Sequence, residues 1–323
     1  MSKPKEAFLV TSFYQFIPLN KDQLPDLKTQ IYELGESLGV RGLFLLSTEG
    51  FNATLSGPES ALAQFRPQME ALLGTGEGSK WGKIFFKDHR TDRHVFLKMR
   101  VKIRPEIVTL GKPEVVPTSP VNRHLEPEEW HRVLEEENDV LVLDTRNRYE
   151  YDIGKFSGAV DLNIEEFQSF PEKIKEAGIP KDKKILMYCT GGIRCEKALI
   201  EMQNQGYENV YQLNGGIINY IEKFPHGLWE GECFVFDYRV AVDRQLRPSK
   251  VYGLCPHCGQ PAKQKVDCGQ CGQVDVVCDR CLSIGDPALL TCSKNCAHHY
   301  RMGHKSKRPH LDPLRRRGIS STA

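Results

Sequence analysis

A glycine-rich connection between a strand and a helix constrains this chain more than any other feature. Residues 184–188 (KILMY) are typical of a buried strand, and a helix is expected to begin near Cys195, so Cys189 falls in the connection. Backbone N–H groups at a helix start lack partners, and with the helix dipole they favour a thiolate. Two glycines let the loop curl around the sulfur, and Arg194 adds positive charge. The sequence therefore predicts that Cys189 has a lowered pKa and acts as a nucleophile or sulfur carrier.

Four stretches in order resemble a rhodanese domain, over roughly residues 125–229. They are residues 140–146 (VLVLDTR), 149–159 (YEYDIGKFSGA), 188–197 (YCTGGIRCEK) and 212–217 (QLNGGI). The resemblance implies that Cys189 and Arg194 are the catalytic residues. The residues expected to support them are Thr190, Gly191, Gly192, Ile193, Cys195, Asp144 and Arg146. Cys195 either resolves an oxidised or persulfidated Cys189 or packs the helix, and Asp144 with Arg146 either shapes the pocket or forms an internal ion pair.

The length of the loop separates two chemistries. Four residues lie between Cys189 and Arg194, whereas phosphatases of the rhodanese fold have five and so make room for a phosphate. The shorter loop resembles the sulfurtransferase type and disfavours phosphatase activity. The alternative, a buried thiol with a structural role, has no need of the two glycines or of the arginine.

Eight of the eleven cysteines form closely spaced pairs in the last quarter of the chain. In a cytosolic protein such pairs favour a metal over disulfides, and tetrahedral zinc takes four thiolates. Two structural zinc ions are therefore predicted, because the segment has too few apolar residues to fold on core burial alone. The pairs combine either sequentially or in a crossed pattern, and an iron–sulfur cluster is the alternative. The predicted ligands are Cys255, Cys258, Cys268, Cys271, Cys278, Cys281, Cys292 and Cys296.

The first hundred residues have the element order β-α-β-β-α-β of a ferredoxin-like or acylphosphatase-like α+β domain. Apolar residues at helical spacing, ending at Gly39, predict one helix, and Pro58 is expected to open the other. The expected helices span residues 22–38 and 58–73. The expected strands span residues 7–16, 42–47, 51–56, 83–87 and 95–101.

Two basic segments are candidates for RNA contact. Lys98, Arg100, Lys102 and Arg104 recur with a period of two, which places them on one face of an extended segment. The alternative is an edge strand that uses charge to prevent aggregation. The second segment is the C-terminal tail, which suits a polyanion or is simply solvated. Its candidate RNA-binding residues are Arg315, Arg316 and Arg317.

The chain of 323 residues is long enough for two or three domains. No apolar run approaches the roughly 20 residues that span a bilayer, and the first residues lack a signal-peptide core, so a cytoplasmic protein without membrane contact is expected. The fold class is α/β multidomain. The expected parts are an acylphosphatase-like or ferredoxin-like domain (1–110), a linker (111–122), a rhodanese domain (123–229), a Cys-rich zinc module (230–299) and a basic tail (300–323).

This combination resembles the oxygen-dependent tRNA uridine(34) hydroxylase family over nearly the full length. The motifs that carry the resemblance outside the rhodanese domain are residues 11–16 (TSFYQF), 49–57 (EGFNATLSG), 98–104 (KMRVKIR) and 234–237 (FVFD). The resemblance implies a tRNA hydroxylase that acts at the anticodon loop and forms 5-hydroxyuridine at the wobble position. It also implies molecular oxygen as co-substrate and Cys189 as the catalytic cysteine. The residues contain no flavin or haem motif.

Two other functions stay open at this stage. A rhodanese-like sulfurtransferase that carries a persulfide on Cys189 is supported equally by the loop alone. A non-enzymatic RNA or protein adaptor built around the zinc module is the third, although an adaptor would have no use for an activated thiol. For the hydroxylase, the expected mechanism is attack of Cys189 on C6 of uridine, which makes C5 nucleophilic, with Arg194 and the loop N–H groups stabilising the sulfur anion.

Overall fold

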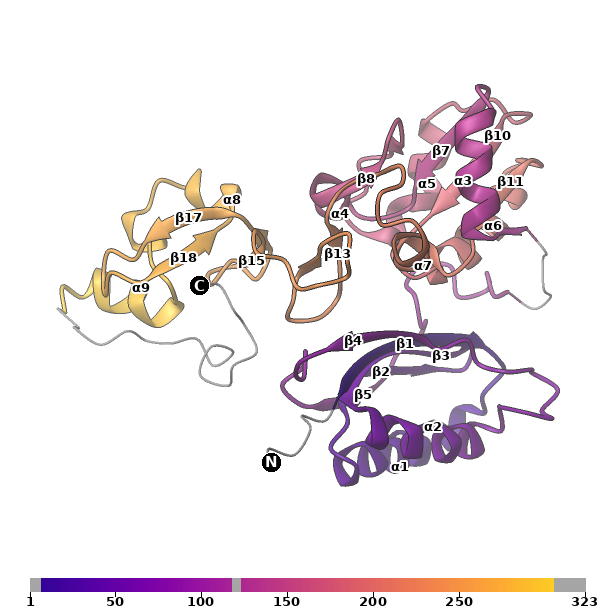
Figure 1. Cartoon of the computed structure of the whole chain (residues 1–323), viewed down its shortest axis with the longest axis horizontal. Helices are drawn as coiled ribbons and strands as arrows, with labels where there is room; N and C mark the ends of the chain where they lie inside the picture. The colour runs from indigo at the N-terminus through magenta and orange to yellow at the C-terminus, as the bar shows by residue number, and fades with distance from the viewer. Residues whose placement is uncertain (1–6, 118–122, 305–323) are drawn as a thin grey trace. The chain divides into compact units, whose positions relative to one another are not determined.

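The computed structural model describes residues 7–117 and 123–304 (Figure 1). Of these residues, 7–117, 123–234 and 244–246 form a first compact unit, and 235–243 and 247–304 form a second. The multidomain α/β fold predicted from the sequence is confirmed, and the five-part division with its residue limits stays a prediction. The predicted tail residues Arg315, Arg316 and Arg317 lie outside the described residues.

The first unit begins with a five-stranded sheet of order β4-β1-β3-β2-β5. Both β1 and β2 pair antiparallel with β3, whereas β5 runs parallel to β2. Figure 1 shows α1 and α2 on one face of this sheet. Its elements are β1 (Phe8–Phe16), η1 (Lys21–Gln23), α1 (Leu24–Ser37), β2 (Arg41–Ser47), β3 (Gly50–Pro58), α2 (Glu59–Leu73), β4 (Lys87–Thr91) and β5 (Met99–Ile103).

The two helices form close to where the sequence predicts them, because their apolar residues recur every three or four positions. In α2, Phe65 and Met69 are fully buried against the sheet, and Gly74 ends the helix in the left-handed conformation. Phe13, Phe44 and other aromatic side chains from the strands complete this core.

Two of the predicted strands are wrong by several residues. The structure places strands at β4 and β5 instead of at residues 83–87 and 95–101. Ile84 packs into the main core from an unpaired segment. Val95 and Phe96 form a small cluster with Val10 on the opposite side of the sheet. Burial without backbone pairing therefore imitates a strand pattern at both edges of this sheet.

A second five-stranded sheet follows, with the order β6-β11-β10-β7-β9 and parallel pairing throughout. Its elements are β6 (His124–Leu125), α3 (Pro127–Glu136), β7 (Val140–Asp144), α4 (Arg148–Ile153), β9 (Val160–Asp161), η2 (Phe167–Ser169), α5 (Phe170–Glu176), β10 (Lys184–Tyr188), α6 (Ile193–Asn204), β11 (Val210–Leu213) and α7 (Gly216–Lys223). A separate ribbon pairs β8 (Gly154–Phe156) with β12 (Trp229–Gly231), and β13 (Cys233–Phe234) follows. The central strand β10 is buried, and Cys189 follows its carboxyl end. Ligands of open parallel α/β sheets bind at this end of the strands.

The second unit contains short hairpins and small helices around two groups of cysteines. Its elements are β14 (Ala241–Val242), β15 (Gly253–Leu254), β16 (Pro261–Ala262), β17 (Gln264–Asp267), β18 (Val274–Val277), α8 (Asp279–Leu282), η3 (Pro287–Leu289) and α9 (Lys294–Arg301). Across the described residues, every helix is too short or too polar to span a membrane.

Candidate active site and metal centres

The loop after β10 wraps around the sulfur of Cys189. The backbone N–H of Gly192 donates a hydrogen bond to Sγ at 3.1 Å, and Cys189 is 1% exposed. Gly192 has φ 96°, a conformation that favours glycine, and it precedes the first residue of α6. The sulfur thus lies beside the start of a helix, as the sequence predicts.

Electrostatics make Cys189 the ionised member of a pair of thiols. Burial raises its pKa, but the hydrogen bond from the Cys195 thiol, the charge of Arg194 and the backbone N–H groups together lower it to about 6. Burial and the bond to Cys189 raise the pKa of Cys195 well above its usual value. The two pKa values shift in opposite directions, so the negative charge lies on Cys189. Cys195 therefore stays protonated and donates to a thiolate.

A second pair of glycines closes the loop from the other side. The N–H groups of Ile217 and Ile218, at the start of α7, donate to the carbonyls of Cys189 and Thr190 at 3.0 and 3.3 Å. A Cβ at Gly216 would lie 2.5 Å from the carbonyl oxygen of Cys189. Only glycine permits this approach, which explains the Gly-Gly turn found in the sequence.

Arg194 is bound to a buried carboxylate. Its two terminal nitrogens donate to the oxygens of Glu150 at 2.6 and 2.8 Å, and Thr190 donates to the same group at 3.2 Å. Burial raises the pKa of Glu150, but the charge and hydrogen bonds of Arg194, the charge of Arg146 and the backbone N–H of Asn147 together lower it. Glu150 also closes a capping box with Asn147 at the start of α4. The bidentate contact fixes the guanidinium next to the loop.

Asp144, the last residue of β7, and Arg146, two positions later, form an internal ion pair. Both side chains are fully buried, the closest atoms are 2.6 Å apart, and Arg146 also donates to the carbonyl of Gly154. The residue between them, Thr145, lies 3.6 Å from the sulfur of Cys195. The pair stabilises the floor of the site, whereas Thr145, which the sequence analysis did not single out, contacts the second thiol.

The open face of the N-terminal sheet contacts the cysteine loop. Lys87 donates to the carbonyl of Gly191 at 2.8 Å, and the hydroxyl of Tyr14 donates to Glu196 in the first turn of α6 at 2.9 Å. Burial is the largest cause that raises the pKa of Tyr14, followed by the negative charge of Glu196, so the phenol stays protonated. Glu196 also lies 3.0 Å from His124.

Sequence reasoning assigned no role to Lys87 or Glu196, and it considered Tyr14 only as a surface on which a base could stack or as a core residue. Tyr14 and Glu196 lie inside the motifs that carry the family resemblance, so those motifs could have pointed to them. Lys87 lies in no such motif.

A buried cluster of three charges joins the same two parts. Lys197 is fully buried in α6 and lies 2.7 Å from Glu49 and 2.6 Å from Glu106. Glu49 comes from the turn before β3 and accepts from the N–H of Ile107 at 2.6 Å. This cluster fixes the helix that follows the cysteine loop against the N-terminal domain.

The four basic residues at alternate positions, Lys98, Arg100, Lys102 and Arg104, form a basic stripe that lies partly within β5. Met99 and Val101 are buried on the helix side, so Arg100 and Lys102 are on the open face of the sheet. Lys98 and Arg104 flank the strand and are exposed.

The strand register links this stripe to the cysteine loop. Lys87 and Arg100 stand at the two ends of one row of paired residues, whose inner members are Ser12, Thr54 and Leu43. In the neighbouring row Tyr14 and Lys102 share the same face. This face, about 19 Å wide at the usual strand spacing, therefore carries the stripe and the residues that contact the loop.

The eight paired cysteines form two groups of four in the second unit. The groups are Cys255, Cys258, Cys278 and Cys281, and Cys268, Cys271, Cys292 and Cys296. The pairs thus combine in the crossed pattern, first with third and second with fourth. In both groups the first pair lies in a hairpin turn that ends in a glycine at positive φ, Gly259 or Gly272, whose N–H donates to the carbonyl of the first cysteine at 2.8 Å.

The donor sets fit zinc. Four thiolates at 2.3 Å around a tetrahedral ion lie about 3.8 Å from one another. The distance between the sulfurs of Cys258 and Cys278 is 3.4 Å, and the sulfur of Cys271 lies 3.6 and 3.9 Å from those of Cys292 and Cys296. Four ligands would leave no open position, so each ion would stabilise the fold and take no part in chemistry.

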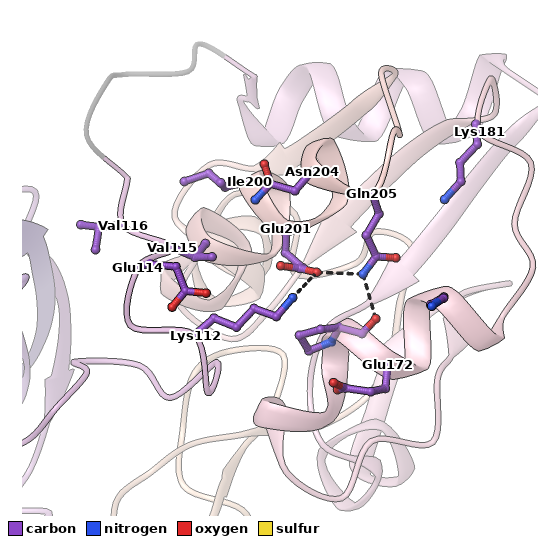
Figure 2. A pocket seen from close by; sticks show the side chains of 12 residues that line it. Lys112, Glu114, Val115, Val116, Glu172, Lys181, Ile200, Glu201, Asn204 and Gln205 are labelled. Carbon is purple, nitrogen blue, oxygen red and sulfur yellow. Dashed lines mark hydrogen bonds and ion pairs between the residues drawn. The ribbon is translucent and has the colours of Figure 1, made fainter.

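A cavity of about 840 Å³ lies elsewhere in the first unit (Figure 2). Most of its lining residues belong to the segment 112–116 and to α5 and α6. The ammonium of Lys112 lies 2.8 Å from a carboxylate oxygen of Glu201 at this cavity. None of the predicted site residues lines this cavity, so it is separate from the cysteine site.

Comparison with known proteins decides the family. Three family descriptions match: the UPF0176 acylphosphatase like domain at residues 8–107, the rhodanese-like domain at 126–223 and the rhodanase C-terminal at 230–297. A tRNA uridine(34) hydroxylase from Bdellovibrio bacteriovorus is 45% identical over 94% of this chain and 85% of its own length.

The chain belongs to the tRNA uridine(34) hydroxylase family. A further family member, from Synechocystis sp., is 42% identical over 80% of this chain and 90% of its own length. Among solved structures, the rhodanese-like domain of the Alr3790 protein from Anabaena sp. is 23% identical, with a TM-score of 0.29, and the match covers 34% of this chain and 80% of that one. The resemblance stated from the sequence is confirmed, and the comparisons favour the hydroxylase over the sulfurtransferase.

Proposed function

We propose that this protein hydroxylates uridine 34 of tRNA at C5, with molecular oxygen as co-substrate, in the cytoplasm. Relatives at 37–45% identity carry the name of this activity. The observation that carries the proposal is the position of Cys189. A cysteine poised as a thiolate lies against a protein face that also carries Arg100 and Lys102, so a polyanionic substrate could present a base to the sulfur.

Cys189 is the proposed nucleophile. Its thiolate adds to C6 of the uracil ring, and the electron pair of the C5–C6 double bond moves towards C5 and the C4 carbonyl, which makes C5 nucleophilic. Molecular oxygen takes two electrons from a donor to form a peroxide-level species, which transfers one oxygen atom to C5 and leaves the other as water. Loss of the C5 proton and of the thiolate then gives 5-hydroxyuridine. Arg194 and the N–H of Gly192 stabilise the sulfur anion at the start and at the end.

The other proposed site residues hold this arrangement. Thr190, Gly191, Gly192 and Ile193 shape the loop, and Cys195 donates to the thiolate. Asp144 and Arg146 support the sheet edge beneath it. In the second unit the two groups of cysteines would hold two structural zinc ions.

RNA binding is assigned to the open face of the N-terminal sheet. We propose that Lys98, Arg100, Lys102 and Arg104 contact phosphates of the anticodon stem-loop, and that Arg315, Arg316 and Arg317 add to this field. The position of the stripe on the face that contacts the loop supports this assignment over a merely solvated edge strand.

Nucleoside mass spectrometry of tRNA tests the activity. Cells that lack the protein should lose 5-hydroxyuridine-derived nucleosides under air, and the wild-type chain should restore them. Cys189→Ser should restore none. Cys233→Ser is the matched control, because burial raises the pKa of Cys233 to about 12 and so keeps it an unreactive thiol. Normal hydroxylation by Cys189→Ser would refute the proposal.

The sulfurtransferase alternative rests on the four-residue spacing between Cys189 and Arg194. It predicts a stable persulfide on Cys189 after treatment with thiosulfate, detected as the mass of one added sulfur atom. A persulfide with an unchanged hydroxylation profile would favour this alternative.

A further inference from the structure

Lys87 is buried in an unusual way. It is 7% exposed and opens the edge strand β4, and its ammonium donates to a carbonyl oxygen of the cysteine loop. Among the residues that the structure describes, no carboxylate lies within ion-pair distance of its nitrogen. Lys197, by contrast, is buried between two carboxylates. Burial of an ammonium without a carboxylate is costly, so a lysine at this position requires another source of negative charge.

The surroundings of Lys87 identify that source. Its nitrogen lies 4.7 Å from the centre of the Tyr14 ring and 5.8 Å from that of Phe85, so aromatic faces cover it. Burial lowers the pKa of Lys87 to about 8, and the negative charges of Cys189 and Glu196 oppose this effect. Glu196 is already held by Tyr14 and His124. Lys87 is therefore influenced by two anions, Glu196 and the Cys189 thiolate, and the thiolate belongs to the loop whose Gly191 carbonyl accepts from Lys87.

We propose that Lys87 is an active-site residue supplied by the N-terminal domain, where it balances the charge of the Cys189 sulfur and then protonates the anion that the sulfur creates on the substrate. This inference rests on the proposed function. When the S–C6 bond forms, the C5–C6 π pair shifts to C4–C5 and the C4 carbonyl π pair moves to O4. A proton passes from the Lys87 ammonium to O4, which leaves a neutral amine and a neutral enol. No electrons leave or enter in this step.

The neighbouring groups are less suited to the transfer. The guanidinium of Arg194 is bonded to Glu150, and an arginine does not release its proton. The hydroxyl of Tyr14 is directed at Glu196. Lys87 donates a hydrogen bond to one carbonyl oxygen, and it can exchange this bond for one to the substrate. Its pKa of about 8 is close to neutral pH, where general acids act best.

The test uses the full chain with Lys87→Met, which keeps the length of the side chain without its charge, and Lys87→Arg, which keeps the charge. Lys83→Met is the matched control, because Lys83 is 73% exposed and pairs with Glu77 on the surface. The first measurement is the pH dependence of iodoacetamide alkylation at the Cys189 peptide, followed by mass spectrometry. It needs no tRNA. The second is the rate of tRNA hydroxylation, with thermal melting to verify the fold.

Lys87→Met should move the midpoint of alkylation upwards from about 6 by up to about one pH unit, because an opposite charge is lost. It should also slow hydroxylation about 100-fold. Lys87→Arg should keep the midpoint and still lose rate, and Lys83→Met should change neither. An unshifted midpoint or full hydroxylation in Lys87→Met would overturn the proposal. A shifted midpoint with no hydroxylation by the wild type would refute the proposed function instead, and would support Lys87 as the counter-ion of Cys189.

Discussion

The cysteines of the two units have opposite surroundings. Cys189 is surrounded by N–H donors, a protonated thiol and a guanidinium, so each neighbour that counteracts burial stabilises one isolated thiolate. In the second unit, sulfurs of the paired cysteines lie only 3.4–3.9 Å from one another, although some of them also accept from backbone N–H groups. Thiolates crowded together in this way need a cation between them. Under the proposed function, cysteine therefore serves as a nucleophile in one unit and as a metal ligand in the other, and its neighbours distinguish the two roles.

The largest expected effect concerns the paired cysteines of the second unit. Cys278→Ser should remove the ion from its own group and leave the other group loaded, because the two groups belong to separate small cores. Structural zinc contributes about 10–16 kcal/mol in small domains, so the region around β15 and α8 should unfold locally. Native mass spectrometry should count one zinc ion fewer per chain. Cys189→Ser should retain both ions, and loss of zinc from that variant would contradict the distinction.

A second prediction concerns the reactivity of the Cys189 thiolate. The thiolate of Cys189 disappears as the pH falls through about 6, so its alkylation rate should be constant above pH 7 and fall about tenfold per unit below 6. The hydrogen bond from Cys195 is the foremost cause that lowers this pKa. Cys195→Ala should therefore raise the midpoint by about one unit.

Cys195→Ser retains a donor and serves as the control for this experiment. Its midpoint should stay near that of the wild type. Equal midpoints in both variants would show that Cys195 only fills space, which was the alternative assigned to it from the sequence.

The smallest expected effect concerns the basic stripe. Arg100→Ala should weaken tRNA binding a few-fold and reduce the slope of log affinity against log salt by about 0.7 to 0.9, as expected for one lost phosphate contact. Lys28→Ala is the control, because Lys28 is exposed on α1, which covers the other face of the sheet. Binding measured between 50 and 200 mM salt, about the range over which such contacts are lost, distinguishes the two variants. Equal slopes would remove Arg100 from the proposed interface.

Local patterns predicted what depends on neighbours in sequence. Helical spacing located α1 and α2, and the glycine loop with its flanking strand located Cys189 beside a helix start. The spacing of the cysteines predicted eight candidate ligands but left the crossed pairing open, because the pairing depends on how the hairpins fold back. Val95 and Phe96 imitated a strand because burial alone does not reveal backbone pairing.

The missed residues depend on contacts distant in the chain. Lys87 reaches Gly191 across 104 positions, and Tyr14 reaches Glu196 across 182. No periodicity encodes such contacts, so a buried lysine in an edge strand is indistinguishable from a solvated one until the two sheets are seen together. The quoted motifs contain Tyr14 and Glu196, but they did not predict the contact between these two residues.

The cluster of Lys197 with Glu49 and Glu106 has a consequence for how the first unit folds. Each part holds charges that the other neutralises: two adjacent carboxylates on one side and a buried ammonium on the other. Removal of the ammonium while the two parts stay packed would leave two buried carboxylates uncompensated, at a cost of about 3–5 kcal/mol. The stability of each part therefore depends on the other. A rhodanese domain from another protein could not replace this one without a matching partner for both carboxylates.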